Sequence, residues 1–287
     1  MTNANGSSAK YVYGVVRTSR ASPPKAIGIN DEPIALVKAD GVAALTSDVP
    51  GEFLEAGREE LLTHSRVLEG ALEDGTVLPM RFGVVMPGEE SVRDELLTHS
   101  RVLEQALQGG VVLPMRFGVV MPDEESVRDQ LLSPHREKLE AQLDEMDGKV
   151  EINIKGIYDE GAILREVLAH SSEAAKLRQA IRGKPEDATY YERIRLGEVV
   201  AQELDLKRAE DERAIVDRML AHAAAVEVGE LVHERMAVNA SFLVERTGLQ
   251  GFDRAIDELG EEQAGRIRLR YTGPLPPHSF VELTMEG

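Results

Sequence analysis

Val-Leu-Pro-Met-Arg-Phe-Gly-Val-Val-Met-Pro stands at residues 77–87 of this chain and returns unchanged at residues 112–122. The repeat extends further, because residues 60–94 align on residues 95–129 with five differences among 35 positions, which leaves 30 identities. The differing pairs are Gly70/Gln105, Glu73/Gln108, Asp74/Gly109, Thr76/Val111 and Gly88/Asp123. Repeat architectures usually need three or more units with atypical terminal units. Two near-identical units within otherwise unrepeated sequence therefore indicate a tandem duplication inserted in a domain.

Each copy predicts a helix followed by a strand. Apolar residues at helical spacing predict a helix over 59–73, and the run at 78–86 predicts a strand. Pro79 has no N–H to donate, so it is expected at the start of this strand or on a sheet edge. The second copy predicts the same order, with a helix over 89–108 and a strand over 111–121. The helix-bearing connection between the identical strands is well beyond the ~12 residues that a parallel crossover requires, so they can be parallel neighbours joined right-handedly.

The sequence before the duplication predicts three further strands. The run at 11–16 is rich in β-forming residues and is typical of a central strand. Two short apolar runs at 34–38 and 42–46 are separated by Asp40-Gly41, which is a hairpin signal. The first half is thus predicted as β-β-β-α-β followed by the duplicated α-β unit.

The second half predicts a different order of elements. Strict alternation of apolar and polar residues at 150–155 predicts a half-buried strand. The elements expected after it are helices over 160–169, 172–182 and 186–224, strands over 226–232 and 237–245, a helix over 250–263 and a strand over 266–271. This order contains the β-α-β-β-α-β pattern of ferredoxin-like folds, with an enlarged first crossover.

The long helix of the second half carries a narrow apolar seam. Its members step by four, three, four and three residues, and they are Tyr190, Ile194, Gly197, Ala201 and Leu204. Such a stripe is suited to packing on one partner helix or sheet.

We therefore predict an α+β protein of two α/β domains, ferredoxin-like or variants of that fold. A flexible tail is expected over 1–10 and a second domain over 148–287. The first domain, over 11–147, contains the duplicated unit.

The charge balance excludes several classes of partner. The chain has 33 Lys and Arg against 51 Asp and Glu, for a formal net charge of −18. This argues against nucleic acid, which is bound mainly by cationic side chains, and against an anionic membrane surface. Cysteine is absent, which excludes disulfides, thiolate metal sites and a Cys nucleophile. No apolar run approaches the ~18 residues needed to span a bilayer, and the polar start lacks the apolar core of a signal peptide, so a cytoplasmic protein is expected.

Three pieces of sequence, in this order, resemble the gas vesicle protein F/L family over nearly all of 11–284. They are the run at 11–16, the Leu-Pro-Met-Arg-Phe-Gly run, and Tyr-Thr-Gly-Pro-Leu-Pro-Pro-His-Ser-Phe-Val at 271–281. The family carries the Leu-Pro-Met-Arg-Phe-Gly unit once, so one copy here is surplus. It also usually has an aromatic residue where His278 stands.

The resemblance implies two α/β domains and no catalytic residues. It further implies an accessory or minor structural protein at the gas vesicle. Such a protein takes part in vesicle assembly by binding the small hydrophobic shell protein, together with other accessory proteins.

Seven residues are candidates for binding a partner. Arg81 and Phe82, with their duplicates Arg116 and Phe117, combine residue types enriched at binding hot spots. The alternative is that the Arg tethers its strand to an acidic helix while the Phe packs inside. The other three, Pro274, Pro276 and Pro277, either form a rigid turn that guides the last strand or offer a stiff surface for docking.

The remaining groups of histidines and acidic residues do not predict a metal-binding or catalytic site. His64 and its duplicate His99 face the apolar side of their helices with no second ligand at metal-binding spacing, so we expect no metal. Paired acids lie at helix N-termini or on solvated faces. No cofactor motif is present and no enzyme is expected.

Two alternatives remain open. One is a small-molecule-sensing regulatory protein of ferredoxin-like fold, since fold alone does not fix function. The other concerns the surplus unit, which could mediate self-association or domain swapping.

Overall fold

The structure is a computed structural model, and it describes residues 9–19, 23–49, 58–80, 83–85, 117–185 and 187–281. The chain forms two compact units, Met1–Gly148 with Leu275–Gly287, and Lys149–Pro274. The division after Gly148 lies one residue from the predicted boundary. Residues 275–281 were predicted in the second domain, but they pack with the first unit. Ala9 and Lys10, predicted as tail, belong to the first strand.

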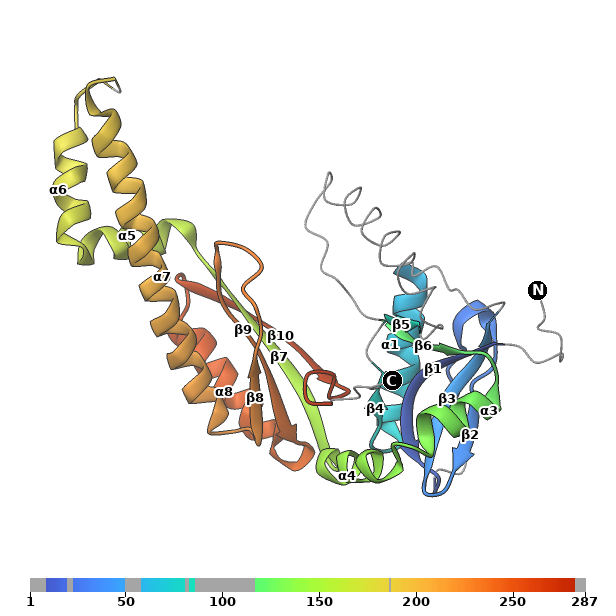
Figure 1. The fold of residues 1–287 in the computed structure, drawn as a ribbon. Coiled ribbons are helices and arrows are strands. Elements are labelled where there is room, and N and C mark those ends of the chain that lie inside the picture. The colour runs from blue at the N-terminus through green and yellow to red at the C-terminus, as the bar shows by residue number, and fades with distance from the viewer. Residues whose placement is uncertain are drawn as a thin grey trace. The chain divides into compact units, whose positions relative to one another are not determined.

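The first unit is built on one sheet, whose strands are labelled in Figure 1. They are β1 (Ala9–Arg17), β2 (Ala35–Ala39), β3 (Val42–Val49), β4 (Leu78–Pro79), β5 (Gly83–Val85) and β6 (Phe117–Met121). The order is β2-β3-β1-β6-β5, and β4 also pairs with β1. β1 pairs antiparallel with β3, β4 and β6.

The helical elements of the first unit flank this sheet. They are η1 (Ile29–Asp31), α1 (Arg58–Glu73), α3 (Glu124–Ser126), the π-helical turn η2 (Val127–Leu132) and α4 (Arg136–Met146). The apolar face predicted for 59–73 is the one that α1 buries, through His64, Val67, Leu68, Ala71 and Leu72.

β1 is the central strand predicted from its composition, and its side chains are buried on both faces. Tyr11 and Tyr13 are fully buried with ring centroids 4.7 Å apart. The Tyr13 hydroxyl accepts from the Ile29 N–H at 2.8 Å and lies 2.8 Å from the Ser47 hydroxyl. Each buried phenol therefore sits in a hydrogen-bonded setting, as buried tyrosines require.

Gly14 marks a close approach of two strands. A Cβ at this position would lie 2.7 Å from the carbonyl oxygen of Leu78. The register of β1 on β3 also shifts between Val12 and Gly14. Glycine therefore lets β4 lie against β1 at this point.

The single strand predicted over 78–86 is wrong. Leu78–Pro79 forms β4, whereas Gly83–Val85 forms β5, which does not pair with β1. The reason is competition, because β6 of the second copy occupies the rest of the β1 edge. The parallel pairing of the identical strands is confirmed, since Val84 lies opposite Val119 and Val85 opposite Val120. The helix predicted over 89–108 lies outside the described residues.

The second unit follows the predicted order of elements closely. Its strands are β7 (Lys149–Tyr158), β8 (Ala225–Val228), β9 (Met236–Glu245) and β10 (Ile267–Leu275), in the order β10-β7-β9-β8. Its helices are α5 (Glu160–His170), α6 (Ser172–Ile181), α7 (Tyr190–Leu220) and α8 (Leu249–Glu262), with short 3₁₀ turns η3 (Asp187–Thr189) and η4 (Arg246–Gly248). As the alternation predicted, Val150, Ile152 and Ile154 are buried.

Helices α7 and α8 pack on this second sheet. Phe242 of β9 and Phe252 of α8 place their ring centroids 5.5 Å apart. Helix α6 and the N-terminal part of α7 form a helical hairpin that extends beyond the strands (Figure 1). In the described part of the chain, no helix combines the length and the apolar character needed to cross a membrane.

Candidate functional site: the exposed seam of helix α7

The seam that the sequence marked on the long helix is exposed in the second unit. Tyr190 and Ile194 are 61% and 46% exposed, and Gly197 and Ala201 are also exposed. Leu204 is half-buried. The packing expected for this stripe is therefore not made by the described residues.

The neighbourhood of the seam adds two features. Tyr191, beside it, is 81% exposed and meets the Tyr190 ring edge-on at 5.6 Å. A Cβ built on Gly197 would meet no atom within 4 Å, so the middle of the seam is open. Large side chains at its ends and small ones at its centre leave room for another backbone to approach.

Other residues of α7 make its intramolecular contacts. Val199, Asp211, Ile215 and Met219 are its buried members. The N-terminal half is also tied to α6 by an ion pair between Arg195 and Glu173, at 2.9 Å. The seam is thus free because a different stripe holds the helix in place.

A charged cluster fixes the C-terminal half of α7 to the sheet. Arg266, in the turn just before β10, donates to Asp211 of α7 at 2.6 Å and to Glu166 of α5 at 2.7 Å and 3.2 Å. Tyr158 of β7 donates to the same Asp211 carboxylate at 2.7 Å. Lys207 lies 3.4 Å from Glu166 and 3.7 Å from Asp211. The cluster joins two helices to β7 and to the turn before β10, and it pairs two acids with two cations.

The pKa values of the cluster reflect these contacts. The hydrogen bond from Arg266 lowers the pKa of Glu166, with a further contribution from Lys207. Burial, and then the bond to Asp211, raise the pKa of Tyr158, which therefore stays protonated. Burial alone would lower the pKa of Arg266, but its bonds to Glu166 and Asp211 outweigh this and raise it. Glu166 is thus held as a carboxylate paired with Arg266 at neutral pH.

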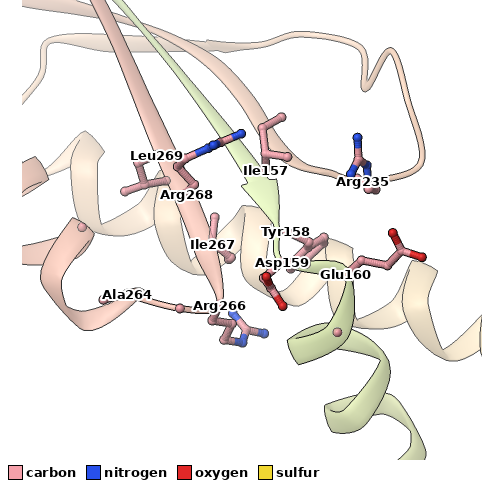
Figure 2. Close-up of a pocket in the computed structure, with 13 residues that line it drawn as sticks. Ile157, Tyr158, Asp159, Glu160, Arg235, Ala264, Arg266, Ile267, Arg268 and Leu269 are labelled. Carbon is pink, nitrogen blue, oxygen red and sulfur yellow. The ribbon is translucent and has the colours of Figure 1, made fainter.

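An open hollow of about 690 Å³ lies beside this cluster (Figure 2). Asp159 and Glu160 stand at the start of α5, and Arg235 comes from the segment before β9. Asp159 caps α5 by accepting from the Ala162 N–H at 2.8 Å. Since Arg266 is already bound to two carboxylates, the cations that the hollow offers to a ligand are the exposed Arg235 and Arg268.

Of the seven residues predicted to bind a partner, the structure describes four. Arg81, Phe82 and Arg116 lie outside the described residues, and Phe117 opens β6, where only its backbone is described. The three prolines divide: Pro274 is exposed near the end of β10, whereas Pro276 and Pro277 are buried in the first unit. Burial of these two favours the structural interpretation of the proline segment over docking.

His64 is buried in the first unit with an exposed fraction of 3%. Its Nδ1 lies 2.9 Å from the Tyr11 hydroxyl, and its ring stacks on Tyr13 at 5.6 Å. Burial lowers its pKa to about 3, with a smaller contribution from His278. His64 is therefore a neutral core residue. Among the described residues, no group of three His, Asp or Glu could hold a metal ion.

Comparison with known proteins identifies the family. The family described as gas vesicle synthesis protein GvpL/GvpF matches residues 9–97 and 92–282. A gas vesicle protein F from Streptomyces sp. (strain CB03234) is 35% identical over 275 residues, which cover 95% of this chain and 99% of that protein. The chain belongs to the GvpL/GvpF family.

A second relative and a solved structure also match the chain over nearly its whole length. A gas vesicle protein F from Dolichospermum flosaquae is 28% identical over 95% of this chain and 97% of its own length. The crystal structure of the gas vesicle protein GvpF from Anabaena sp. PCC7120 matches with a TM-score of 0.70 at 22% identity, covering 97% of this chain and 98% of that one. The family match splits into two overlapping parts within the duplicated stretch.

Sequence reasoning missed two features of this site. Tyr191 was overlooked because it lies off the regular spacing of the seam. The cluster around Arg266 was overlooked because Asp211 stands between Glu210 and Glu212 in a charged run that is typical of a solvated face. A buried tyrosine at the end of a strand, Tyr158, was the available signal for a buried acid.

Proposed function

We propose that this protein is a non-enzymatic accessory or minor structural protein of gas vesicles, which takes part in their assembly by binding the small hydrophobic shell protein. Membership of the GvpL/GvpF family over nearly the whole chain supports the gas vesicle role. The exposed seam of α7 is the observation on which the proposed binding surface rests. Its members are Tyr190, Ile194, Gly197, Ala201 and Leu204, with Tyr191 at its side.

The seam fits an apolar helix of the partner. From residue 190 to residue 204 it extends about 21 Å at 1.5 Å per residue, which is about four helical turns. Burying half-exposed aromatic and aliphatic side chains contributes about 1 kcal/mol each. Gly197 and Ala201 allow close approach of helices, as small residues do at other helix–helix contacts. The contact is therefore specific in shape and modest in strength.

The charges next to the seam are paired within the helix. Glu198 and Asp205 lie on one flank and are exposed, but Glu198 pairs with Arg195 at 3.2 Å and Asp205 with Arg208 at 2.7 Å. The seam itself is therefore complemented by a partner helix with small apolar residues. The net charge of −18 keeps the protein itself soluble while the seam engages an apolar chain.

We assign the second unit to the ferredoxin-like folds. Support comes from the strand order β10-β7-β9-β8 and the antiparallel pairing of β7 and β8 with β9. The enlarged crossover of α5, α6 and α7 supplies the hairpin that bears the seam. The protein then acts at the gas vesicle, with the shell protein and other accessory proteins as partners.

A pull-down with co-expressed shell protein tests the seam. Ile194→Asp is expected to abolish retention at low and high salt, because an exposed apolar contact becomes a charged one. Leu206→Asp is the matched control, since Leu206 is 64% exposed on the same helix but off the seam. Equal retention by the wild type and Ile194→Asp would refute the surface, and no retention by the wild type would refute the function.

A second pair of variants tests close approach. Gly197→Trp adds bulk where a Cβ meets nothing within 4 Å, so the isolated protein tolerates it while a partner backbone is kept away. Gly260→Trp on α8 is the control, because its site is equally open. We expect retention to fall for the first variant alone, with equal thermal midpoints for both.

A further inference from the structure

The edge of β1 is filled by pieces of both copies of the duplicated unit. Gly14 and Val15 pair with Pro79 and Leu78 of the first copy, and the Met80 N–H donates to the Tyr13 carbonyl at 2.9 Å. Lys10, Tyr11 and Val12 pair with Met121, Val120 and Val119 of the second copy. On this edge of β1, the first copy therefore fills one part of a single strand position and the second copy fills the rest.

The continuation of β4 in the first copy is chemically identical to β6. Residues 77–87 and 112–122 do not differ at any position. The first copy's Val84 and Val85 lie beside their own duplicates in β6. The β1 edge thus has two candidate occupants with the same side chains, and the described structure places one on it and the other next to it.

The contacts outside the strand explain why the chain uses both copies. Thr76 of the first copy donates to Asp147 at 2.7 Å, which its duplicate Val111 has no hydroxyl to do. Gly70 of the first copy lies against Pro24, where its duplicate Gln105 would bring a large side chain. These differences favour the first copy before the strand.

After the strand, the preference reverses. Asp123 of the second copy caps α3 by accepting from the Ser126 N–H at 2.7 Å, and this bond lowers the pKa of Asp123. Its duplicate, Gly88, has no side chain for this cap. In the favourable arrangement, the first copy therefore fills the start of the strand position beside β1 and the second copy fills its end. The change from one copy to the other falls within the identical residues, and their side chains do not determine at which residue it occurs.

We propose that the β1 edge is a binding site for the Gly-Val-Val-Met segment that either copy can occupy, by moving the crossing point within the identical strand. In the described arrangement the crossing lies between Met80 and Phe117. If it moves to the end of the strand, Val84, Val85 and Met86 take the places of Val119, Val120 and Met121 opposite Val12, Tyr11 and Lys10, and the Thr76 and Asp123 contacts are both kept. In each arrangement the strand position beside β1 is interrupted by the same 35 additional residues. The entropy cost of closing this loop depends only weakly on its length, so it does not favour either arrangement.

A double-mutant cycle tests this exchange. Val120 is buried on the β1 edge, so Val120→Asp destroys a fixed β6. If the copies exchange, Val85→Asp and Val120→Asp each leave the thermal midpoint near that of the wild type, whereas the double variant unfolds the first unit. Val16→Asp is the control, because Val16 is buried in β1 and has no duplicate. Unfolding by Val120→Asp alone, with Val85→Asp silent, would overturn the proposal.

Disulfide trapping gives a second measurement that needs no destabilised variant. The chain has no cysteine, so engineered pairs are the sole thiols. Val12 lies opposite Val119, and Val12→Cys with Val119→Cys should crosslink in the described arrangement. Exchange predicts that Val12→Cys with Val84→Cys also crosslinks within the monomer. Failure of this second pair, or its crosslinking in dimers alone, would contradict exchange within one chain.

Discussion

Replacing Arg266 with methionine should destabilise the second unit more than any other single change in its charged cluster. The substitution keeps much of the side-chain bulk at the turn before β10 but removes the guanidinium that donates to Glu166 and Asp211 at 2.7 Å and 2.6 Å. These carboxylates are 23% and 12% exposed, so they are poorly solvated. Removing one partner of a buried ion pair leaves an uncompensated charge.

The magnitude follows from what remains. Breaking a buried pair costs roughly 3–5 kcal/mol. Lys207 stays 3.4 Å from Glu166 and 3.7 Å from Asp211, so it offsets part of the loss. Tyr158 also keeps its bond to Asp211. We therefore expect a loss of about 3 kcal/mol, which for a unit of this size is about 10 °C in thermal midpoint.

The assay is urea unfolding followed by circular dichroism, with hydrogen exchange on α7 and β10 to assign the transition to the second unit. Arg268→Met is the control, because Arg268 lies two residues further along, in β10, and is exposed. A shift for Arg266→Met no larger than that of the control would refute the view that the cluster anchors α7.

Acid titration adds a check on the sign of the effect. Arg266 lowers the folded-state pKa of Glu166, so the pair contributes stability above the unfolded pKa of about 4.3 and loses it as pH falls. The variant should therefore show a shallower loss of stability below that pH than the wild type. If the free energy of unfolding depended on pH in the same way below about 4.3 in the variant and the wild type, Arg266 would not hold the Glu166 carboxylate.

The remaining predictions concern the first unit. The pKa of His64 is about 3 when folded and about 6.5 when unfolded, so the unfolded chain binds the extra proton between these values. Stability should fall by about 1.4 kcal/mol per pH unit below 6, and His64→Gln should flatten this slope in unfolding midpoints measured from pH 4 to 7. Gly14→Ala places a Cβ 2.7 Å from the Leu78 carbonyl and should cost about 1–3 kcal/mol by urea unfolding, whereas a neutral result would show that β4 yields easily. Deleting residues 60–94 should leave a cooperatively folded protein within about 1 kcal/mol of the wild type, because the main loss is the bond from Thr76 to Asp147; loss of folding would show that both copies are required.

Local sequence patterns predicted the elements of the second unit well, because its strands and helices show clear alternation and N-cap residues. The alternation at 150–155 places Val150, Ile152 and Ile154 on one face, which is the buried face in the structure. Helix limits agreed for the same reason, since Asp159 and Ser171 are N-cap residues that accept from Ala162 and Ala174.

The seam of α7 shows what periodicity leaves undecided. The regular spacing from Tyr190 to Leu204 marks an apolar stripe, but spacing does not say whether the partner belongs to the same chain. Burial within the unit instead falls on Val199, Ile215 and Met219, whose spacing is less regular. Among the predicted binding residues that the structure describes, Pro276 and Pro277 are buried, whereas Pro274 is exposed.

The duplicated strands could be recognised from the sequence but not placed by it. Identical residues have identical propensities, so the choice between Val85 and Val120 for the edge of β1 depends on contacts elsewhere. Those contacts join distant parts of the chain, such as Thr76 with Asp147. Pairing predictions from local sequence contain no information about them.

The crossing between copies inside the sheet also bears on how such a gene changes over generations. A tandem copying error of 35 codons would ordinarily break a domain at its two new joints. Here both joints can fall within the eleven identical residues of 77–87 and 112–122, so the residues that line the β1 edge stay the same. Of each pair of duplicated strand residues, one then lies beside β1 and the other at the outer edge of the sheet in β5, so selection acts differently on the two.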